Sequence, residues 1–275
     1  MGIRTTVSKR VDKAILGYGM IRPGDRVLVG LSGGKDSVTL THQLGSKAGR
    51  YPIPFTVEAV HIRTEYADID GLDRLAQLCD RLGVPLHQVE VSVTGRLKPG
   101  RKMSCYWCST QRRTELLRYA DAHGFDRIAL GHHMDDILET FLMNLTQKAE
   151  ISTMLPLLKY DRYPQWIIRP LAWVTEAQTD AYAADIGYQA VRCRCGYDTT
   201  SRRKAIRRTL ETIIAAEGEA SRERMMKALH AVRTDYMPRY VEDQPVHPGD
   251  LTADSPNDRD LPDPDESSLT DADWV

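Results

Sequence analysis

The sequence predicts an α/β fold: a mostly parallel sheet with helices on both faces. Short apolar runs rich in β-branched residues alternate with longer helical patterns along most of the 275 residues, and glycines or prolines separate them. Alternation of this kind is typical of parallel strands joined by crossover helices. Ligands in such sheets bind at the carboxyl ends of the strands, so we expect the functional residues there.

The individual elements follow from the same patterns. Strands are expected at 26–31, 55–62, 86–93, 127–131 and 165–171, with a last strand and loop at 187–196. Helices are expected at 5–20, 38–44, 70–82, 110–123, 135–146, 175–186, 200–217 and 221–236. Asp135 and Thr175 are expected to cap the helices that they begin, since both side chains accept hydrogen bonds from backbone N–H groups.

These elements divide the chain into four parts. Residues 1–24 are expected to form an N-terminal helix, and residues 25–190 an α/β domain. Residues 191–240 contain a cysteine-bearing loop and two basic helices. Residues 241–275 are expected to be a disordered acidic tail, because they are rich in proline and aspartate and poor in apolar side chains.

The composition is ordinary for a globular protein, with 41% hydrophobic and 27% charged residues. No apolar run of about 18 residues predicts a membrane span, and the N-terminus lacks the apolar core of a signal peptide, so we expect a cytoplasmic protein.

Residues 241–275 carry eleven acids and one base, a net charge of −10, whereas residues 1–240 carry +9. A basic body fits a polyanionic partner such as RNA, and it fits a solvated surface equally well.

A glycine-rich loop, Ser32-Gly33-Gly34-Lys35-Asp36-Ser37, connects the first expected strand to a helix. Glycines allow positive φ and a close approach of the backbone to a ligand. Backbone N–H groups at a helix N-terminus, with two hydroxyls and a lysine, form a binding site for phosphate. The spacing differs from the Walker pattern, which has four residues between its first glycine and Gly-Lys. A plain turn is the alternative interpretation.

The hexapeptide resembles the signature of the PP-loop ATP pyrophosphatases, which release pyrophosphate and attach AMP to a carbonyl oxygen. That family includes argininosuccinate synthetase, GMP synthetase, tRNA lysidine synthetase and the tRNA thiolases. The resemblance implies that residues 25–190 are a PP-loop ATP-binding domain. It also implies that residues 32–37 hold the ATP phosphates and that Asp36 helps to place Mg²⁺.

Five cysteines in a chain without an export signal favour metal or redox chemistry over a disulfide framework. Cys105 and Cys108 stand in an expected loop, where one metal ion can reach both thiolates. A zinc knuckle, a redox dithiol and half of an iron–sulfur site are all open for this pair. Cys193 and Cys195 follow a later expected strand, and the loop that holds them can converge with the loop of Cys105 and Cys108 at one edge of a parallel sheet. Cys79 lies on an amphipathic helix and is expected in the core.

The order of the motifs narrows the resemblance. A PP-loop, C-x-x-C, GHHMDDILET at 131–140, IIRPL at 167–171 and a late Cys-Gly resemble the tRNA-cytidine 2-thiolases between about residues 11 and 204. That family implies a 4Fe–4S cluster held by the C-x-x-C pair and by the cysteine before glycine, here Cys105, Cys108 and Cys195. The family usually has two residues between its late cysteines, and this chain has only one, which leaves Cys193 as an alternative third ligand.

Polar residues follow the fourth expected strand in Gly131-His132-His133-Met134-Asp135-Asp136. Such residues are costly to bury without partners, so a capping turn, a nucleotide site and a dinuclear metal site are the possible interpretations. In PP-loop enzymes this turn lies beside the nucleotide. The resemblance therefore implies that Asp135 and Asp136 assist Mg²⁺ binding or proton transfer. Gly131 and His132, together with His61 at the end of the second strand, are expected to contact the nucleotide.

Basic residues crowd the start of the first C-terminal helix, where Arg203, Lys204, Arg207 and Arg208 are expected on one face. RNA phosphate binding by Arg203, Lys204 and Arg207 is one interpretation. Arg112 and Arg113, which follow the C-x-x-C pair, are expected to add to the same RNA-binding side. A solvated face, or a docking patch for the acidic tail, is the alternative.

Together these features predict an ATP-dependent tRNA sulfurtransferase that forms AMP and pyrophosphate. It would adenylate the C2 oxygen of an anticodon-loop cytidine and replace it with sulfur delivered on the cluster, giving 2-thiocytidine. The expected catalytic residues are Asp36, Asp135, Asp136, Cys105, Cys108 and Cys195. The expected partners are tRNA, a sulfur donor (a cysteine desulfurase or inorganic sulfide) and a second copy of the chain. A 2-thiouridine synthase or lysidine synthetase, and a zinc-bound RNA-binding module, are the competing predictions.

Overall fold

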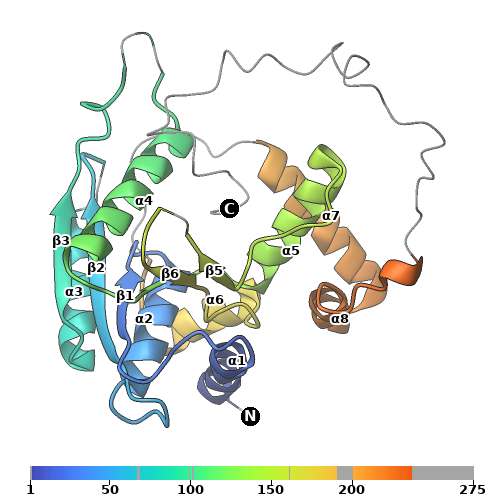
Figure 1. The fold of residues 1–275 in the computed structure, drawn as a ribbon, viewed down its shortest axis with the longest axis horizontal. Coiled ribbons are helices and arrows are strands. Elements are labelled where there is room, and N and C mark those ends of the chain that lie inside the picture. Colours follow the sequence, from blue (N-terminus) through green and yellow to red (C-terminus); the bar gives the residue numbers. More distant parts are fainter. Residues whose placement is uncertain are drawn as a thin grey trace.

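Six strands form one sheet in the order β3-β2-β1-β4-β6-β5 (Figure 1). The computed structural model describes residues 2–66, 69–98, 100, 102–160, 162–190 and 201–236, with the backbone alone at 69–70 and 201–202. The strands are β1 (Arg26–Gly30), β2 (Thr56–Arg63), β3 (Leu86–Glu90), β4 (Arg127–Ala129), β5 (Leu157–Lys159) and β6 (Trp166–Ile168). The helices are α1 (Ile3–Gly17), α2 (Lys35–Lys47), α3 (Ile69–Leu82), α4 (Cys105–Ala122), α5 (Met134–Met143), α6 (Glu176–Asp185), α7 (Ser201–Glu217) and α8 (Ala220–Ala228), with a π turn η1 (Asn144–Lys148) and a 3-10 turn η2 (Thr234–Tyr236).

The sheet is parallel except at one edge. β1 pairs in parallel with β2 and β4, and the pairs β2–β3 and β4–β6 are also parallel. The three-residue strand β5 runs antiparallel to β6 and was not predicted. The mostly parallel α/β fold predicted from the sequence is confirmed.

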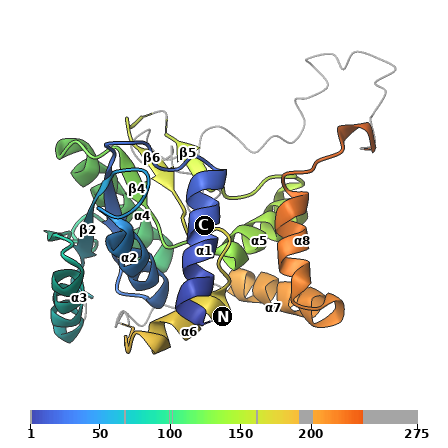
Figure 2. The same ribbon diagram turned by 90° about the horizontal axis from the view of Figure 1, so that it is seen from below.

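Helices cover both faces of this sheet (Figures 1 and 2). On one face, Leu28 and Ile128 of the strands share a core cluster with Leu116 of α4. On the other face, Val27 and Val29 of β1 belong to a second cluster with residues of α1, α2, α3 and α6. Alternate residues of β1 therefore serve the two cores, as a strand buried on both faces requires.

Two further helices lie beyond this layered body. α7 and α8 pack against α5 and against each other (Figure 2). α8 ends at Ala228, earlier than the expected helix 221–236, and over the described residues up to 236 it is followed by the short turn η2. The predicted last strand at 187–196 does not form over residues 187–190, and its remainder lies outside the described residues, as does the tail 241–275.

The sequence prediction for α4 is wrong at its start. α4 begins at Cys105, five residues before the expected Thr110, because Ser104 caps it. The Ser104 hydroxyl accepts a hydrogen bond from the Trp107 backbone N–H at 3.1 Å. The C-x-x-C pair therefore lies in the first turn of a helix rather than in a loop.

The prediction that Asp135 caps α5 is also wrong. His133 occupies the N-cap position, and its Nδ1 accepts a hydrogen bond from the Asp136 backbone N–H at 3.4 Å. The Asp136 carboxylate in turn accepts one from the His133 backbone N–H at 2.9 Å. This reciprocal capping box ties Asp136 to the start of its own helix and leaves Asp135 available for other contacts.

Buried charge also organises the amino edge of the sheet. Arg127 of β4 donates from Nε to Asp25, which precedes β1, at 2.7 Å, and both side chains are at least nine-tenths buried. The Asp25 carboxylate also accepts the Arg22 backbone N–H at 2.7 Å. This pair fixes the entry of β1 beside β4.

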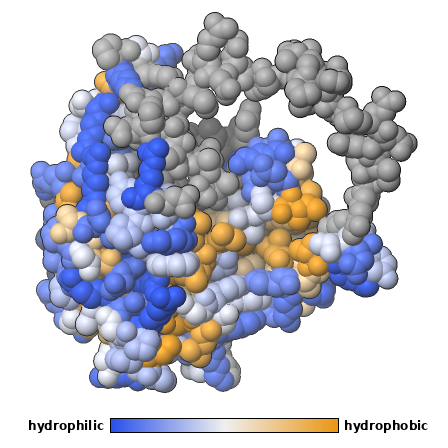
Figure 3. Space-filling model, in the orientation of Figure 1, coloured by the Kyte–Doolittle hydropathy of each residue, from blue (hydrophilic) through white to orange (hydrophobic). Residues whose placement is uncertain are grey.

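Apolar side chains remain at the surface around the end of α5. Leu145, Ile151 and Leu155 are all about half exposed or more. Figure 3 shows orange surface in this region of the molecule. None of the helices in the described part of the chain is both long and apolar enough to cross a membrane.

The capping of α6 can be tested directly. Thr175 accepts a hydrogen bond from the Gln178 N–H, and Gln178 accepts one from the Thr175 N–H, as the sequence prediction of this cap requires. Replacing Thr175 with Ala should lower the free energy of unfolding by about 1 kcal/mol in urea titrations. Thr209→Ala is the matched control, because Thr209 is exposed within α7. Equal unfolding free energies for the two variants would contradict this capping role.

Candidate active site

The glycine-rich loop joins the carboxyl end of β1 to the N-terminus of α2. Gly33 adopts a φ of +88°, which a residue with a side chain rarely tolerates. The Ser32 hydroxyl lies 3.1 Å from the Ser37 hydroxyl, and the Ser37 hydroxyl donates to the Gly34 carbonyl at 2.9 Å. Gly34, the N-cap of α2, has no side chain to cover the first N–H groups of the helix. The loop therefore presents backbone N–H groups and two hydroxyls to an anion.

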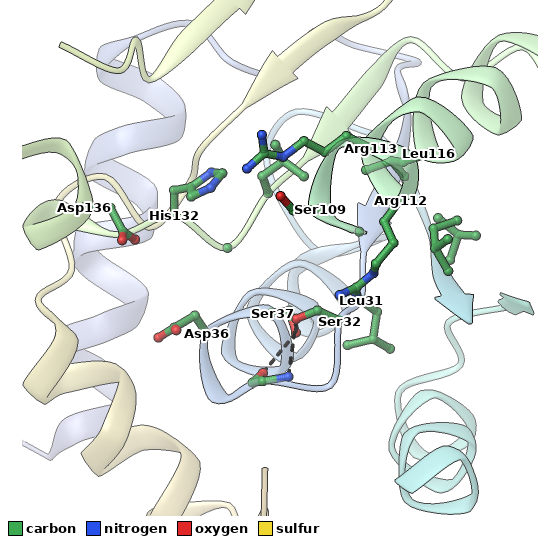
Figure 4. A pocket seen from close by; sticks show the side chains of 16 residues that line it. Leu31, Ser32, Asp36, Ser37, Ser109, Arg112, Arg113, Leu116, His132 and Asp136 are labelled. Atoms are coloured by element: carbon green, nitrogen blue, oxygen red, sulfur yellow. Dashed lines mark hydrogen bonds between the residues drawn. The ribbon is translucent and has the colours of Figure 1, made fainter. Parts of the chain in front are cut away.

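A pocket of about 340 Å³ lies at this loop, at the carboxyl edge of the sheet (Figure 4). Its walls come from the glycine-rich loop, from α4 and from the turn after β4. The predicted site residues that line it are Ser32, Gly34, Asp36, Ser37, Gly131, His132, Asp136, Arg112 and Arg113. Gly33, Lys35 and His61 were also predicted and belong to the same region, but they are not among the lining residues.

The turn after β4 is packed tightly on the start of α2. A Cβ atom added to Gly131 would lie 2.9 Å from the Ser37 backbone nitrogen and 3.1 Å from the Ser37 Cα. Both contacts are with backbone, so no side-chain rotation can relieve them. Glycine at 131 therefore allows the turn after β4 to pack directly on the start of α2.

Asp136 departs from the protonation expected of a buried carboxyl group, whereas His132 follows that expected of a buried imidazole. Burial opposes ionisation of Asp136, but His133, His132 and Arg203 together lower the pKa of this carboxyl to about 2. Burial, reinforced by the charge of Arg169, lowers the pKa of His132 to about 3. At neutral pH the pocket therefore holds an ionised Asp136 beside a neutral His132.

Asp135 does not line the pocket. Its carboxylate is 3% exposed and accepts the Glu176 backbone N–H at the start of α6 at 2.7 Å. The other oxygen pairs with Arg222 of α8, also at 2.7 Å. These contacts fasten α6 and α8 to the turn that carries Asp136, so Asp135 acts on the pocket through neighbouring elements.

Lys35 and Asp36 form a second charged group beside the loop. Lys35 Nζ lies 2.9 Å from Asp36 Oδ1 and 3.4 Å from Glu176 Oε1. Asp36 also accepts a hydrogen bond from the Thr179 hydroxyl at 2.5 Å. Burial disfavours the charged form of Lys35, yet Asp36 and Glu176 raise its pKa overall. The lysine therefore stays cationic next to the anion site.

His61 supports the loop from behind. It is buried, and its Nδ1 bonds the Leu31 carbonyl at 2.7 Å, which ties the end of β2 to the residue after β1. Burial, with a contribution from Arg112, lowers the pKa of His61. The neutral ring therefore supports the strand end beside the pocket and does not line the pocket itself.

Helix α4 connects the cysteine pair to the pocket. Cys105 and Cys108 lie in its first turn, and both side chains are partly exposed. Ser109 and Arg112 lie four and seven residues after Cys105, which places them on the same side of the helix, and both line the pocket. Figure 4 shows the Arg112 side chain extending towards Ser32 and that of Arg113 towards His132.

The third predicted cluster ligand cannot be placed. Cys195 and its alternative Cys193 lie outside the described residues. Within the part of the chain that the structure describes, no three His, Cys, Asp or Glu side chains gather as a metal-binding set. Cys79 lies in the core with no exposed surface, as predicted, and burial raises the pKa of its thiol to about 11.

The structure divides the predicted basic face of α7. Arg203 and Arg207 turn inwards and form ion pairs with Asp136, Glu139 and Glu176. Lys204 and Arg208 are exposed. The expectation that all four residues share one face is therefore wrong, because α5 covers part of the helix.

Comparison with known proteins places the chain in a family. The PP-loop domain family matches residues 3–213. A tRNA-cytidine(32) 2-sulfurtransferase from Xanthomonas oryzae pv. oryzae is 41% identical over 209 residues, which cover 74% of this chain and 68% of the relative. Another from Xanthomonas axonopodis pv. citri is 38% identical over 235 residues, covering 84% and 76%. The chain belongs to the PP-loop family, in its tRNA-cytidine 2-sulfurtransferase branch.

A solved structure supports the fold of this PP-loop protein. The U34-tRNA thiolase NcsA from Methanococcus maripaludis, determined with its [4Fe-4S] cluster, aligns with a TM-score of 0.68 at 21% identity. The alignment covers 83% of this chain and 78% of the thiolase. The family resemblance inferred from the SGGKDS, C-x-x-C and GHHMDD motifs is confirmed.

Several site residues of this PP-loop protein were not found from sequence. Glu139, Glu176, Thr179 and Arg222 hold the predicted residues in place. Glu139 could have been found as the acid one turn after Asp136 on the same helix. The other three come from distant elements and become visible only through tertiary contacts.

The close packing at Gly131 gives a test of the PP-loop geometry. Gly131→Ala should push the first turn of α2 away from the turn after β4, and so weaken ATP binding about tenfold or more in equilibrium titrations. Gly17→Ala is the control, since a Cβ at Gly17 meets nothing within 4 Å. If Gly131→Ala binds ATP like Gly17→Ala, the backbone contact does not set the site.

Proposed function

We propose that this chain is an ATP-dependent tRNA sulfurtransferase that converts an anticodon-loop cytidine to 2-thiocytidine. The observation that carries this proposal is the continuity of α4. One helix holds the Cys105–Cys108 pair in its first turn and then lines the PP-loop pocket with Ser109 and Arg112. A nucleotide site and a thiolate pair on one rigid element are the arrangement needed to activate an atom and then replace it with sulfur.

The relatives support the same chemistry. The two curated relatives described above bear the name tRNA-cytidine(32) 2-sulfurtransferase, and each match covers most of both chains. The structural neighbour is named as a tRNA thiolase with a [4Fe-4S] cluster. The combination of a PP-loop with C-x-x-C and a late Cys-Gly supports carrying both properties to this chain.

In the first step the C2 oxygen of cytidine attacks the α-phosphorus of ATP, a P–O bond forms and pyrophosphate leaves. Residues 32–37 would bind the phosphates through backbone N–H groups and hydroxyls, with Lys35 nearby as a cation. Asp36 and the ionised Asp136 both line the pocket and would hold Mg²⁺ through carboxylate oxygens. Neutral His132 would donate a hydrogen bond without adding positive charge.

In the second step sulfide attacks C2, a C–S bond forms, and the C–O bond breaks with release of AMP. Adenylation is needed because oxide is a poor leaving group and AMP is a good one. Cys105 and Cys108 fit two thiolate ligands of an iron–sulfur cluster, since they lie one helical turn apart and remain partly exposed. With Cys195 as third ligand, a 4Fe–4S cluster would keep one iron open and supply the sulfide.

The partners follow from this chemistry. Exposed Lys204 on α7 is proposed to contact tRNA phosphates, and Arg112 and Arg113 lie where the reacting nucleotide would enter. The sulfur donor would be a cysteine desulfurase or inorganic sulfide, and the working unit a homodimer. Because the substrate is tRNA, we infer a cytoplasmic setting.

The products of the nucleotide reaction test the first step. With tRNA, Mg²⁺ and ATP the protein should form AMP and pyrophosphate. Lys35→Ala, which removes a cation beside the phosphates, or Asp36→Ala, which removes a proposed Mg²⁺ ligand, should lower this rate about a hundredfold or more. Asp80→Asn, an exposed site on α3, is the control. Chromatography that finds ADP and phosphate as products would contradict the proposal.

The cluster assignment has its own test. Anaerobically purified protein should contain iron and acid-labile sulfide in similar amounts. Ser at Cys105, Cys108 or Cys195 should remove most of both, whereas Ser at buried Cys79 should not. Zinc as the sole metal, or iron retention in all three Ser variants, would overturn this assignment.

A further inference from the structure

The inner face of α7 packs against α5, the helix that carries Asp136. Leu210 and Ile214 of this helix are buried in the core, and Arg203 and Arg207 lie above them on the same side. The side chains of Arg203 and Arg207 are 33% and 44% exposed, so both remain partly covered by α5. Exposed Arg208 lies on the outer side.

Glu139 of α5 holds these two arginines. Its side chain has no exposed surface, and its two oxygens accept from different partners. Arg203 Nε donates to Oε2 at 2.9 Å, and Arg207 Nε donates to Oε1 at 2.7 Å. A buried carboxylate is stable only when both oxygens are satisfied, so Glu139 requires both arginines in place.

Arg203 contacts a residue that lines the pocket, and Arg207 contacts the charged group beside the pocket. A terminal nitrogen of Arg203 donates to Asp136 Oδ1 at 2.9 Å. The second oxygen of Asp136 is held by the His133 N–H, so Arg203 completes the fixation of this side chain. Arg207 lies 3.4 Å from Glu176, the acid that also contacts Lys35 of the PP-loop.

We propose that Arg203 is a residue of the nucleotide site and that Glu139 is the positioning residue that holds it there. Asp36 and Asp136 place negative charge in the pocket where a triphosphate would bind; Arg203 offsets the charge of Asp136, and Arg207 offsets that of Glu176 beside Lys35. The inference deepens the proposed use of ATP. It moves Arg203 and Arg207 out of the RNA-binding surface and leaves exposed Lys204 on it.

The first test compares ATP affinity in matched variants, measured by calorimetry with Mg²⁺ and without tRNA. Arg203→Gln should weaken ATP binding about tenfold or more, because it removes a charge-assisted partner of Asp136. Arg203→Lys should be intermediate, since an ammonium is a point charge that cannot bridge two carboxylates in the same way. Arg208→Gln makes the same charge change on the exposed side of α7 and should bind ATP like the parent.

The Glu139→Gln variant distinguishes a positioning role of Glu139 from a simple effect of its charge, because the two predict opposite changes in ATP affinity. If only net charge mattered, removal of a negative charge near the pocket would strengthen binding of anionic ATP. If Glu139 positions Arg203, ATP binding should weaken, because the amide NH₂ group would face an arginine N–H. Thermal unfolding of each variant shows whether it folds. If Glu139→Gln does not fold, the ATP affinity of Arg203→Lys still decides the test.

The RNA measurement assigns the two sides of the helix. Lys204→Gln should weaken tRNA binding and reduce the slope of the logarithm of the binding constant against the logarithm of salt concentration by about 1. Arg203→Gln should leave both the affinity and the slope unchanged in the absence of ATP. Equal ATP affinities for Arg203→Gln and Arg208→Gln, or tighter ATP binding by Glu139→Gln, would overturn the inference. Neither result depends on sulfur transfer, so failure here is distinct from failure of the proposed function.

Discussion

The need to satisfy buried carboxylates at the carboxyl edge of the sheet organises this molecule. Asp135 and Glu139 are almost fully buried, and each requires cationic or N–H partners from elements far along the chain. Breaking such a buried pair by removing one partner costs about 3–5 kcal/mol. These acids therefore fasten α6, α7 and α8 to α5, the helix that also carries Asp136.

The same need for partners explains the protonation states of the titratable groups at the pocket. Asp136, which faces the pocket, stays ionised because His133, His132, Arg203 and a backbone N–H group lower the pKa of its carboxyl group. His132 stays neutral because burial and Arg169 disfavour its charged form. The pocket thus combines two carboxylates, those of Asp36 and Asp136, with a loop that presents backbone N–H groups. α4 carries the cysteine pair in its first turn and lines the same pocket with Ser109 and Arg112.

The sequence predicted what is local and failed where distant elements decide. The conformation of the SGGKDS loop follows from its own residues and from the strand and helix beside it, so the loop could be predicted as a candidate phosphate site. Alternating strand and helix patterns predicted the parallel sheet. Strand β5 was missed because three residues give too short a pattern. The start of α4 was misplaced although Ser104 is a standard capping residue, because the preceding loop is rich in glycine, proline and lysine.

The roles of single charged residues show the same limit. Helical spacing put Arg203 and Lys204 together, yet only the contact with α5 decides that one faces a buried glutamate and the other faces solvent. Asp135 and Asp136 are adjacent in sequence, but one fastens helices and the other lines the pocket. Tertiary packing, which no local pattern encodes, therefore separates supporting residues from those that face a ligand.

The central claim is that this fold places sulfur on a tRNA cytidine, and nucleoside mass spectrometry tests it most directly. Total tRNA from a strain that lacks the gene should contain no 2-thiocytidine, and the parent chain should restore it whereas Asp36→Ala should not. Undiminished 2-thiocytidine in the deletion strain would contradict the account, and selective loss of 2-thiouridine would assign the chain to a different base.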